Sequence, residues 1–198
     1  MCCASLDVVH NAVRGKNLSV NYLSYGADVI VNPGCLAEFY LFQLPLAGQA
    51  RVDHRGDEMT ACTRTGTLIN PDRTARLHWT ADCRQLLFQI DRTHLEAVAR
   101  TLTGAPLPGP IRFDTAVDFS SRPGRYIHRS FMACAMGAES RAVFVNQLTG
   151  LDIQIEFDLV QTLLTHQSSN VSHIINRAQP APQPRDIRRA LDYMHANL

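Results

Sequence analysis

The sequence predicts an α+β fold in which a β-barrel of about eight or more short antiparallel strands precedes an α-helical hairpin. Two observations support this prediction. Between residues 18 and 91, short apolar or alternating segments are separated by turn residues at intervals of roughly ten positions, which is typical of an all-β barrel or sandwich. After residue 91 the hydrophobic period lengthens from two residues to the helical value of about 3.6.

The strands are predicted from alternation and from the turns between them. The run Leu-Ser-Val-Asn-Tyr from Leu18 to Tyr22 places apolar side chains on one face and polar ones on the other, as in a half-buried strand, and Gly26 ends it. Further strands are predicted over residues 29–31, 39–46, 49–54, 58–63, 68–69, 75–80 and 85–90. The segments between them contain residues that favour chain reversal, at Asn32-Pro33-Gly34, Ala47-Gly48, Arg55-Gly56, Pro71-Asp72 and Ala81-Asp82.

Three helices are predicted after the barrel. The first opens at Thr93 and ends at Gly104, and its apolar residues share one face. A Pro-rich connection at residues 105–110 leads to the second, at about residues 126–138. Its apolar stripe consists of Ile127, Phe131, Cys134, Ala135 and Ala138. The third helix is predicted at about residues 148–166.

The third helix carries two apolar stripes instead of one. The first stripe consists of Leu148, Leu151, Ile155, Leu159 and Leu163, and the second, on nearly the opposite side, of Ile153, Phe157, Val160 and Leu164. Two apolar faces need two partners. In one interpretation the helix is enclosed within a single domain. In the other, one face packs on the barrel and the other on a second copy of the chain. The dimer would then be formed by Leu151, Ile155, Leu159, Leu163, Phe157 and Leu164.

The C-terminal end contains a linker and the beginning of another helix. The run Asn-Arg-Ala-Gln-Pro-Ala-Pro-Gln-Pro, from Asn176 to Pro184, predicts an extended, semi-rigid linker. Beyond it, apolar residues from Ile187 to Met194 follow helical spacing, and the sequence then stops. We expect this last helix to belong to a truncated domain.

The order of barrel, helical pair, linker and opening helix resembles the AraC/XylS family of transcription regulators. The motifs that carry the resemblance are Leu23-Ser24-Tyr25-Gly26, Pro33-Gly34, Gly48, Leu68-Ile69-Asn70-Pro71-Asp72, Asp82-Cys83, Ser169-Asn170-Val171-Ser172 and the segment from Arg189 to Leu198. The likeness is closest to the XylS-like activators, which respond to benzoate-type acids. The order and spacing of these motifs carry more weight than any one of them.

The resemblance implies a domain division. The implied segments are an N-terminal arm at 1–17, an effector-binding and dimerisation domain at 18–175 with its barrel at 18–91 and its helical part at 92–175, a linker at 176–185, and the first helix of a helix-turn-helix DNA-binding domain at 186–198. It also implies a homodimer that binds DNA only through the missing C-terminal domain.

Composition and charge agree with a sensing domain. The chain has 198 residues, 19 Lys and Arg against 18 Asp and Glu, and a formal net charge of +1, whereas a free-standing nucleic-acid binder usually has a clear basic excess. The N-terminal residues lack the cationic and apolar regions of a signal peptide, and no apolar run is long enough to span a bilayer. We therefore expect a cytoplasmic protein with reduced thiols and no membrane contact.

The residues of a catalytic or metal centre are missing from the sequence. A barrel of this kind resembles a cupin, and many cupins bind a metal through closely spaced histidines. Here His54 and His78 stand alone among the strands, and no HxH or HxxxH motif occurs there. No G-x-S-x-G, HExxH or Gly-rich phosphate loop occurs either. We expect no metal, no cofactor and no enzymatic activity.

A binding barrel needs an apolar cavity with a few polar groups, and the strand at 85–90 offers both kinds of face. Leu86, Phe88 and Ile90 are predicted to pack under the helices. The opposite face would then line the cavity, and the predicted effector-binding residues there are Trp79, Leu77, Leu87, Gln89 and Gln43. The alternative is that Trp79 and its neighbours are ordinary core.

A carboxylate effector also needs a cation or several N–H donors. Arg14 and His10 are the candidates at the mouth of the barrel, whereas Arg51, Arg76 and Arg84 alternate with apolar residues and should face solvent. The expected function is that of a sensor responding to a small aromatic carboxylate. The alternative is a cupin-like enzyme or binding protein with no link to transcription.

Overall fold

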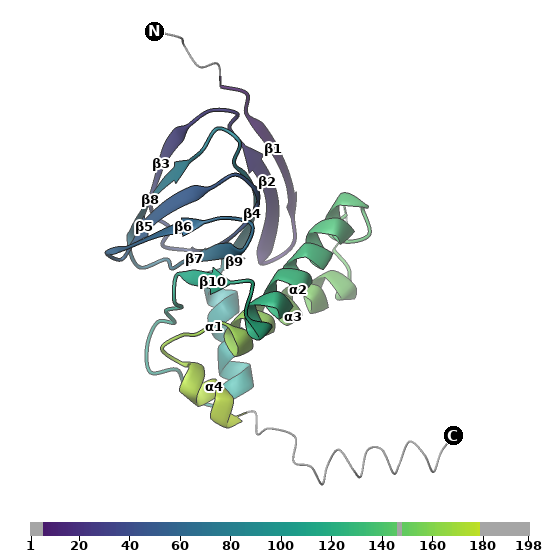
Figure 1. The fold of residues 1–198 in the computed structure, drawn as a ribbon. Helices are drawn as coiled ribbons and strands as arrows, with labels where there is room; N and C mark the ends of the chain where they lie inside the picture. Colours follow the sequence, from purple (N-terminus) through teal and green to yellow (C-terminus); the bar gives the residue numbers. More distant parts are fainter. Residues whose placement is uncertain (1–5, 146–147, 179–198) are drawn as a thin grey trace.

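The computed structural model describes residues 6–145 and 148–178, and the α+β architecture predicted from the sequence is confirmed there (Figure 1). The described residues form ten strands and four helices. The strands are β1 Val9–Arg14, β2 Leu18–Ser24, β3 Val29–Cys35, β4 Phe39–Ala47, β5 Ala50–His54, β6 Asp57–Ala61, β7 Thr65–Ile69, β8 Thr74–Trp79, β9 Arg84–Asp91 and β10 Ala116–Asp118. The helices are α1 Arg92–Thr103, α2 Arg122–Glu139, α3 Gly150–His166 and α4 Ser172–Ala178.

The strands form two antiparallel sheets that together make up the barrel. One sheet has the order β1-β2-β9-β4-β7-β10, and the other has the order β3-β8-β5-β6. The sheets face each other across an apolar cluster, whereas the helices pack on the outer face of the six-stranded sheet (Figure 1). That sheet is therefore buried on both sides, which explains why β4 is almost continuously apolar.

Two strands were not predicted from the sequence. β1 lies within the segment predicted to be an N-terminal arm, and it pairs along its whole length with β2. Nearly all of its side chains are exposed, so it lacks the alternation that marks a half-buried strand. β10 pairs with β7 over only three residues. Both strands lie at the edges of the sheet, where each pairs with a single neighbouring strand. β10 is only three residues long with one buried side chain, Val117, which is too little to mark a strand in the sequence.

The helix boundaries follow capping chemistry. Asp91 caps α1 by accepting a hydrogen bond from the His94 amide, and Gly104 ends the helix in the left-handed conformation at φ 63°. Thr149 and Asp152 form a reciprocal capping box at the start of α3. Residues 176–178, assigned to the linker from the sequence, are instead the last residues of α4. The rest of the predicted linker and the predicted C-terminal helix lie outside the described residues.

The second half of α3 is enclosed within one protomer. Leu159 is only 3% exposed, and Leu163 and Leu164 are buried with it in the cluster that joins the helices to the barrel. Both apolar stripes are therefore covered there by the chain's own α1, α2 and α4. This corrects the expectation that these three leucines face a second copy, because a side chain already in the core offers no surface. None of the described helices is long and apolar enough to cross a membrane.

Candidate ligand-binding site

The inner face of the barrel contains most of the side chains predicted to line a cavity. As the alternation in β9 predicts, Leu86, Phe88 and Ile90 pack against the helices. Leu87 points to the opposite side, where it joins Leu77 and Trp79 in the cluster between the two sheets. The structure thus brings these three predicted residues together.

Three buried polar atoms on the inner side of the barrel have no hydrogen-bond partner among the described residues. They are Nε2 of Gln43, Oε1 of Gln85 and Nε1 of Trp79. Gln43 uses its other amide atom, since its Oε1 accepts a hydrogen bond of 2.7 Å from Thr67 Oγ1. Gln43 pairs with Leu87 and Gln85 with Pro45 across β4 and β9, so the two glutamines are diagonal neighbours on one face. Buried polar groups are nearly always hydrogen-bonded, which makes this group unusual.

Trp79 packs as a core residue in this structure. It is 1% exposed, and its ring lies edge-to-face on that of Tyr25 with the ring centroids 5.3 Å apart. This packing agrees with the alternative in which Trp79 fills the barrel. Its indole N–H has no hydrogen-bond partner among the described residues.

The predicted polar residues divide between the two ends of the barrel. In the strand register, Arg14 of β1 pairs with Ser19 of β2, which pairs with Gln89 of β9. His10 is four residues earlier in β1, about 13 Å away along the strand. Its Nε2 lies 3.1 Å from Oδ1 of Asn21, a buried polar residue on the inner face of the barrel. Arg14 and Gln89 therefore belong to one end of the barrel, and His10 does not share their position.

A pocket of about 410 Å³ lies at the end of the barrel where Arg14 and Gln89 meet. The residues that line it include Arg14, Lys16, Asn17, Ser19, Asn21, Glu38, Phe39, Gln89 and Asp91. Ser19 Oγ donates a hydrogen bond of 3.2 Å to Gln89 Oε1. We call this the mouth pocket. Lys16 and Asn17 were missed in the sequence, because they belong to a turn whose position depends on the pairing of β1 with β2.

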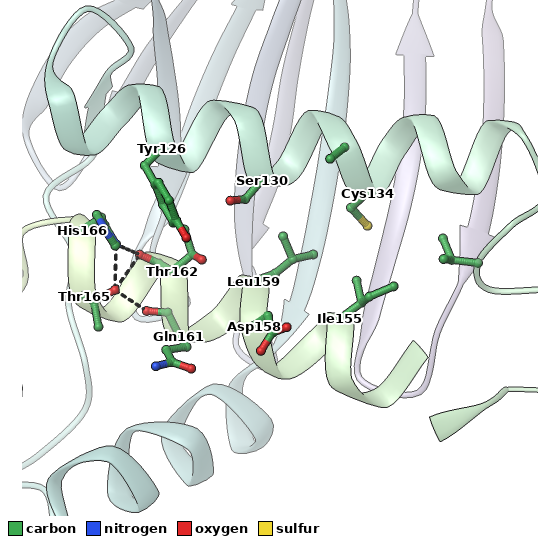
Figure 2. A pocket seen from close by; sticks show the side chains of 12 residues that line it. Tyr126, Ser130, Cys134, Ile155, Asp158, Leu159, Gln161, Thr162, Thr165 and His166 are labelled. Carbon is green, nitrogen blue, oxygen red and sulfur yellow. Dashed lines mark hydrogen bonds between the residues drawn. The ribbon is translucent and has the colours of Figure 1, made fainter. Parts of the chain in front are cut away.

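A second hollow, of about 500 Å³, lies between α2 and α3 (Figure 2). Tyr126 of α2 stacks on His166 of α3 with ring centroids 4.6 Å apart. The imidazole Nδ1 lies 3.1 Å from the carbonyl oxygen of Thr162 and 2.7 Å from Thr165 Oγ1. Two of the predicted dimerisation residues, Ile155 and Leu159, also line this groove.

The first half of α3 exposes apolar side chains. Leu151 is 59% exposed and Ile153 is 47% exposed, while Ile155 and Phe157 are half-buried. Of the residues predicted to form a dimer, Leu151, Ile155 and Phe157 therefore keep accessible surface. The other three do not.

The described residues do not assemble a metal-binding cluster. No group of three His, Cys, Asp or Glu side chains lies close enough to hold a metal ion in the part of the chain that the structure describes. Burial lowers the pKa of His54, whose Nε2 accepts a hydrogen bond from the Asn70 amide. Burial, together with the charge of Glu156, raises the pKa of the Cys134 thiol to about 12, so that thiol stays protonated.

Comparisons with known proteins agree with this architecture. The sequence model of the AraC-binding-like domain matches residues 2–151. Among solved structures, the AraC-like transcriptional activator CuxR is similar, with a TM-score of 0.57 at 12% identity. The match covers 95% of this chain and 63% of CuxR, so the chain spans less than two thirds of that protein.

Other solved structures match less than half of the chain. A cupin superfamily protein from Desulfitobacterium hafniense DCB-2 has a TM-score of 0.38 at 10% identity, covering 42% of this chain and 77% of that chain. KdgF from Halomonas has a TM-score of 0.38 at 10% identity, covering 44% and 83%. No curated protein matches the sequence.

Proposed function

We propose a function from one established premise, which is that the chain belongs to the AraC-binding-like domain family. We propose that it is the ligand-sensing and dimerisation part of a cytoplasmic AraC/XylS-type transcription activator, and not an enzyme. The proposed effector is a small aromatic carboxylate. DNA would be bound by a C-terminal helix-turn-helix domain of which residues 186–198 are the beginning.

The observation that carries the proposal is the polar group inside the barrel. Two donors, Gln43 Nε2 and Trp79 Nε1, and one acceptor, Gln85 Oε1, are buried without partners beside an apolar cluster. Each such atom costs free energy unless something hydrogen-bonds to it. An apolar surface with a few unsatisfied polar atoms is the usual lining of a small-molecule site.

The charges favour a carboxylate at the mouth of the barrel over one in its interior. The buried polar side chains on the inner face of the six-stranded sheet, Asn21, Gln43, Thr67 and Gln85, are uncharged. Burying a carboxylate among them would be costly without a cation. Arg14 and Lys16 line the mouth pocket together with Phe39, so they could hold the carboxylate while the ring packs on Phe39. Glu38 and Asp91 at the same pocket would disfavour a second negative charge.

Thermal unfolding in the presence of sodium benzoate, salicylate, m-toluate or anthranilate tests this function. At least one acid should raise the melting temperature in a saturable way, while the neutral analogue benzamide should not. Arg14→Ala should weaken the effect, and Arg129→Ala, which removes an exposed arginine of α2, should leave it unchanged. If none of the four acids stabilises the protein, an aromatic carboxylate effector is ruled out.

Fluorescence of the single tryptophan tests how far the ligand enters. A ligand that reaches the inner cluster should change the emission of Trp79 in parallel with the thermal stabilisation. If a ligand stabilises the protein and Trp79 emission stays constant, the ligand remains at the mouth pocket and Trp79 is core.

Dimerisation is proposed through the accessible half of α3. Leu151 and Ile153 are exposed there, next to the half-buried Ile155 and Phe157. Leu151→Glu should shift the protein from dimer to monomer in sedimentation velocity. Met136→Glu is the matched control, because Met136 is an equally exposed apolar residue on α2. A monomer in the unmutated protein at tens of micromolar would refute the proposal.

A further inference from the structure

The turn between β1 and β2 lies between the mouth pocket and α3. On one side, Lys16 and Asn17 line the pocket together with Arg14. On the other side, Asn17 contacts Glu156 of α3, which is 139 positions away in the sequence. One short turn therefore touches both the candidate effector site and the helix that carries the proposed dimer surface.

Glu156 depends on Asn17 for its hydrogen bonds. Its side chain is 0% exposed. The Asn17 amide N–H donates to both carboxylate oxygens, at 3.0 and 3.1 Å, and Asn17 Nδ2 donates to Oε2 at 2.8 Å. A buried carboxylate is tolerated only when such donors replace its water. The burial of Glu156 therefore requires the turn to stay in place, and the packed position of α3 depends on that burial.

The turn is also pressed against the connection that leads into α3. A Cβ atom at Gly15 would lie 2.1 Å from Glu156 Oε1 and 2.9 Å from a ring carbon of Phe144, so any side chain there would displace one of these neighbours. Phe144 has φ 56°, an unfavourable backbone conformation for a bulky residue. It is held there by Asp152 of α3, whose Oδ1 accepts a hydrogen bond of 2.7 Å from the Phe144 amide.

The same turn reaches α1. The carbonyl oxygen of Asn17 accepts a hydrogen bond of 2.8 Å from the amide of Asp91. Asp91 caps α1 and also lines the mouth pocket. A displacement of the turn would therefore shift contacts of both α1 and α3.

We infer that the contact between Asn17 and Glu156 couples occupancy of the mouth pocket to the position of α3. This inference rests on the proposed function, because it takes the mouth pocket as the place where the effector's carboxylate binds. A carboxylate held between Arg14 and Lys16 draws the turn towards the pocket. The donors of Asn17 then move relative to Glu156, and α3 either follows the turn or loses the partners of its buried carboxylate. Both outcomes change the helix on which Leu151 and Ile153 are exposed.

The test uses hydrogen exchange of the amides at residues 150–158, and its first arm needs no ligand. Arg14→Glu alters the pocket without touching α3. It should change exchange at 150–158 by several-fold in the wild-type background and leave it unchanged in the Glu156→Gln background. If Arg14→Glu has no effect on α3, or the same effect in both backgrounds, the coupling is refuted.

A double variant that exchanges the donor and acceptor side chains distinguishes a specific contact between Asn17 and Glu156 from general destabilisation. Asn17→Asp places a second carboxylate against Glu156 and should speed exchange at 150–158 by about ten-fold or more. Adding Glu156→Gln restores a donor–acceptor pair in the reversed direction and should return exchange close to the wild-type rate. Asn11→Asp, at an exposed position of β1, is the control and should have no effect on α3. If exchange at 150–158 stays fast in the double variant, the contact between residues 17 and 156 does not couple the pocket to α3.

The second arm uses sodium benzoate as the probe, with its binding followed by calorimetry. Benzoate should change exchange at 150–158 in the wild type and not in Glu156→Gln, and Glu156→Gln should shift the benzoate Kd by about five-fold or more, because coupling is reciprocal. Absence of benzoate binding would count against the aromatic effector alone, since the ligand-free arm still decides the coupling. Binding with identical exchange and Kd in both proteins would overturn the coupling and leave the effector site standing.

Discussion

The two faces of the six-stranded sheet are built from the same strands but differ in chemistry. On the outer face, Phe42 and Phe88 meet Phe131 of α2, with ring centroids 4.7 and 4.8 Å apart in edge-to-face contacts. On the inner face, Gln43 and Gln85 are buried with unpartnered polar atoms. The packing of the outer face therefore stabilises the fold. The inner face keeps polar atoms that reduce stability, and that cost is typical of a surface that binds a ligand.

The largest expected effect lies on the outer face. Phe131→Ala removes the ring that joins the helices to the sheet, and a buried large-to-small change of this kind costs about 3–5 kcal/mol of unfolding free energy. Urea unfolding followed by circular dichroism measures it. A loss below about 1 kcal/mol would mean that the helices are held to the barrel elsewhere.

The next effect lies where the helices meet the barrel mouth. Gly15→Ala places a Cβ atom against Glu156 and Phe144, and overpacking of this kind costs about 1–3 kcal/mol. Gly150→Ala is the matched control: nothing lies within 4 Å of its added Cβ, and alanine favours the helix. Thermal unfolding should therefore separate the two variants, with only Gly15→Ala destabilised. Equal melting temperatures would show that the turn can move away from α3 at little cost.

Acid should act on the inner side of the barrel through His54. Burial lowers the pKa of His54 in the folded protein below the unfolded value of about 6.5. Below pH 6.5 the unfolded state therefore binds a proton that the folded state does not, so stability falls as the pH drops towards the folded pKa. One proton limits this loss to about 1.4 kcal/mol per pH unit.

Urea unfolding at pH 7.5 and pH 5.5 checks the role of His54. The loss of stability between the two pH values should be smaller in His54→Gln than in the wild type. His78→Gln, at an exposed position of the neighbouring strand, should behave as the wild type does. An unchanged pH dependence in His54→Gln would remove His54 as its source.

The smallest expected effect is an increase in the free energy of unfolding, produced by a change on the inner face. Gln85→Met replaces a buried amide whose Oε1 has no partner and whose Nε2 makes only a 3.3 Å contact with Cys83 Sγ. The change should stabilise the protein by about 1 kcal/mol, because it removes an unsatisfied polar group without changing the volume greatly. The same variant should bind the aromatic acid less tightly. Destabilisation by Gln85→Met would show that the amide supports the fold and would weaken the comparison between the two faces.

Local patterns predicted the elements and the faces of the barrel. The alternation in β2 and β9 identified which side chains pack under the helices, and Gly104 marked the end of α1, because these features depend on residues close together in the sequence. The inner residues Leu77, Trp79 and Leu87 could be grouped for the same reason. Their role in ligand binding stays a prediction.

The sequence by itself determined the fold class, the order of the elements and the side of each strand that is apolar, since the hydrophobic period within a segment dictates them. The tertiary structure alone decided how the apolar faces are used. It placed β1 at the sheet edge, buried both stripes of α3 at Leu159 and Leu164, and brought Asn17 to Glu156. Those outcomes depend on pairing and packing between separate segments, which lie 139 positions apart in the case of Asn17 and Glu156, and no local pattern records which partner will cover a given face.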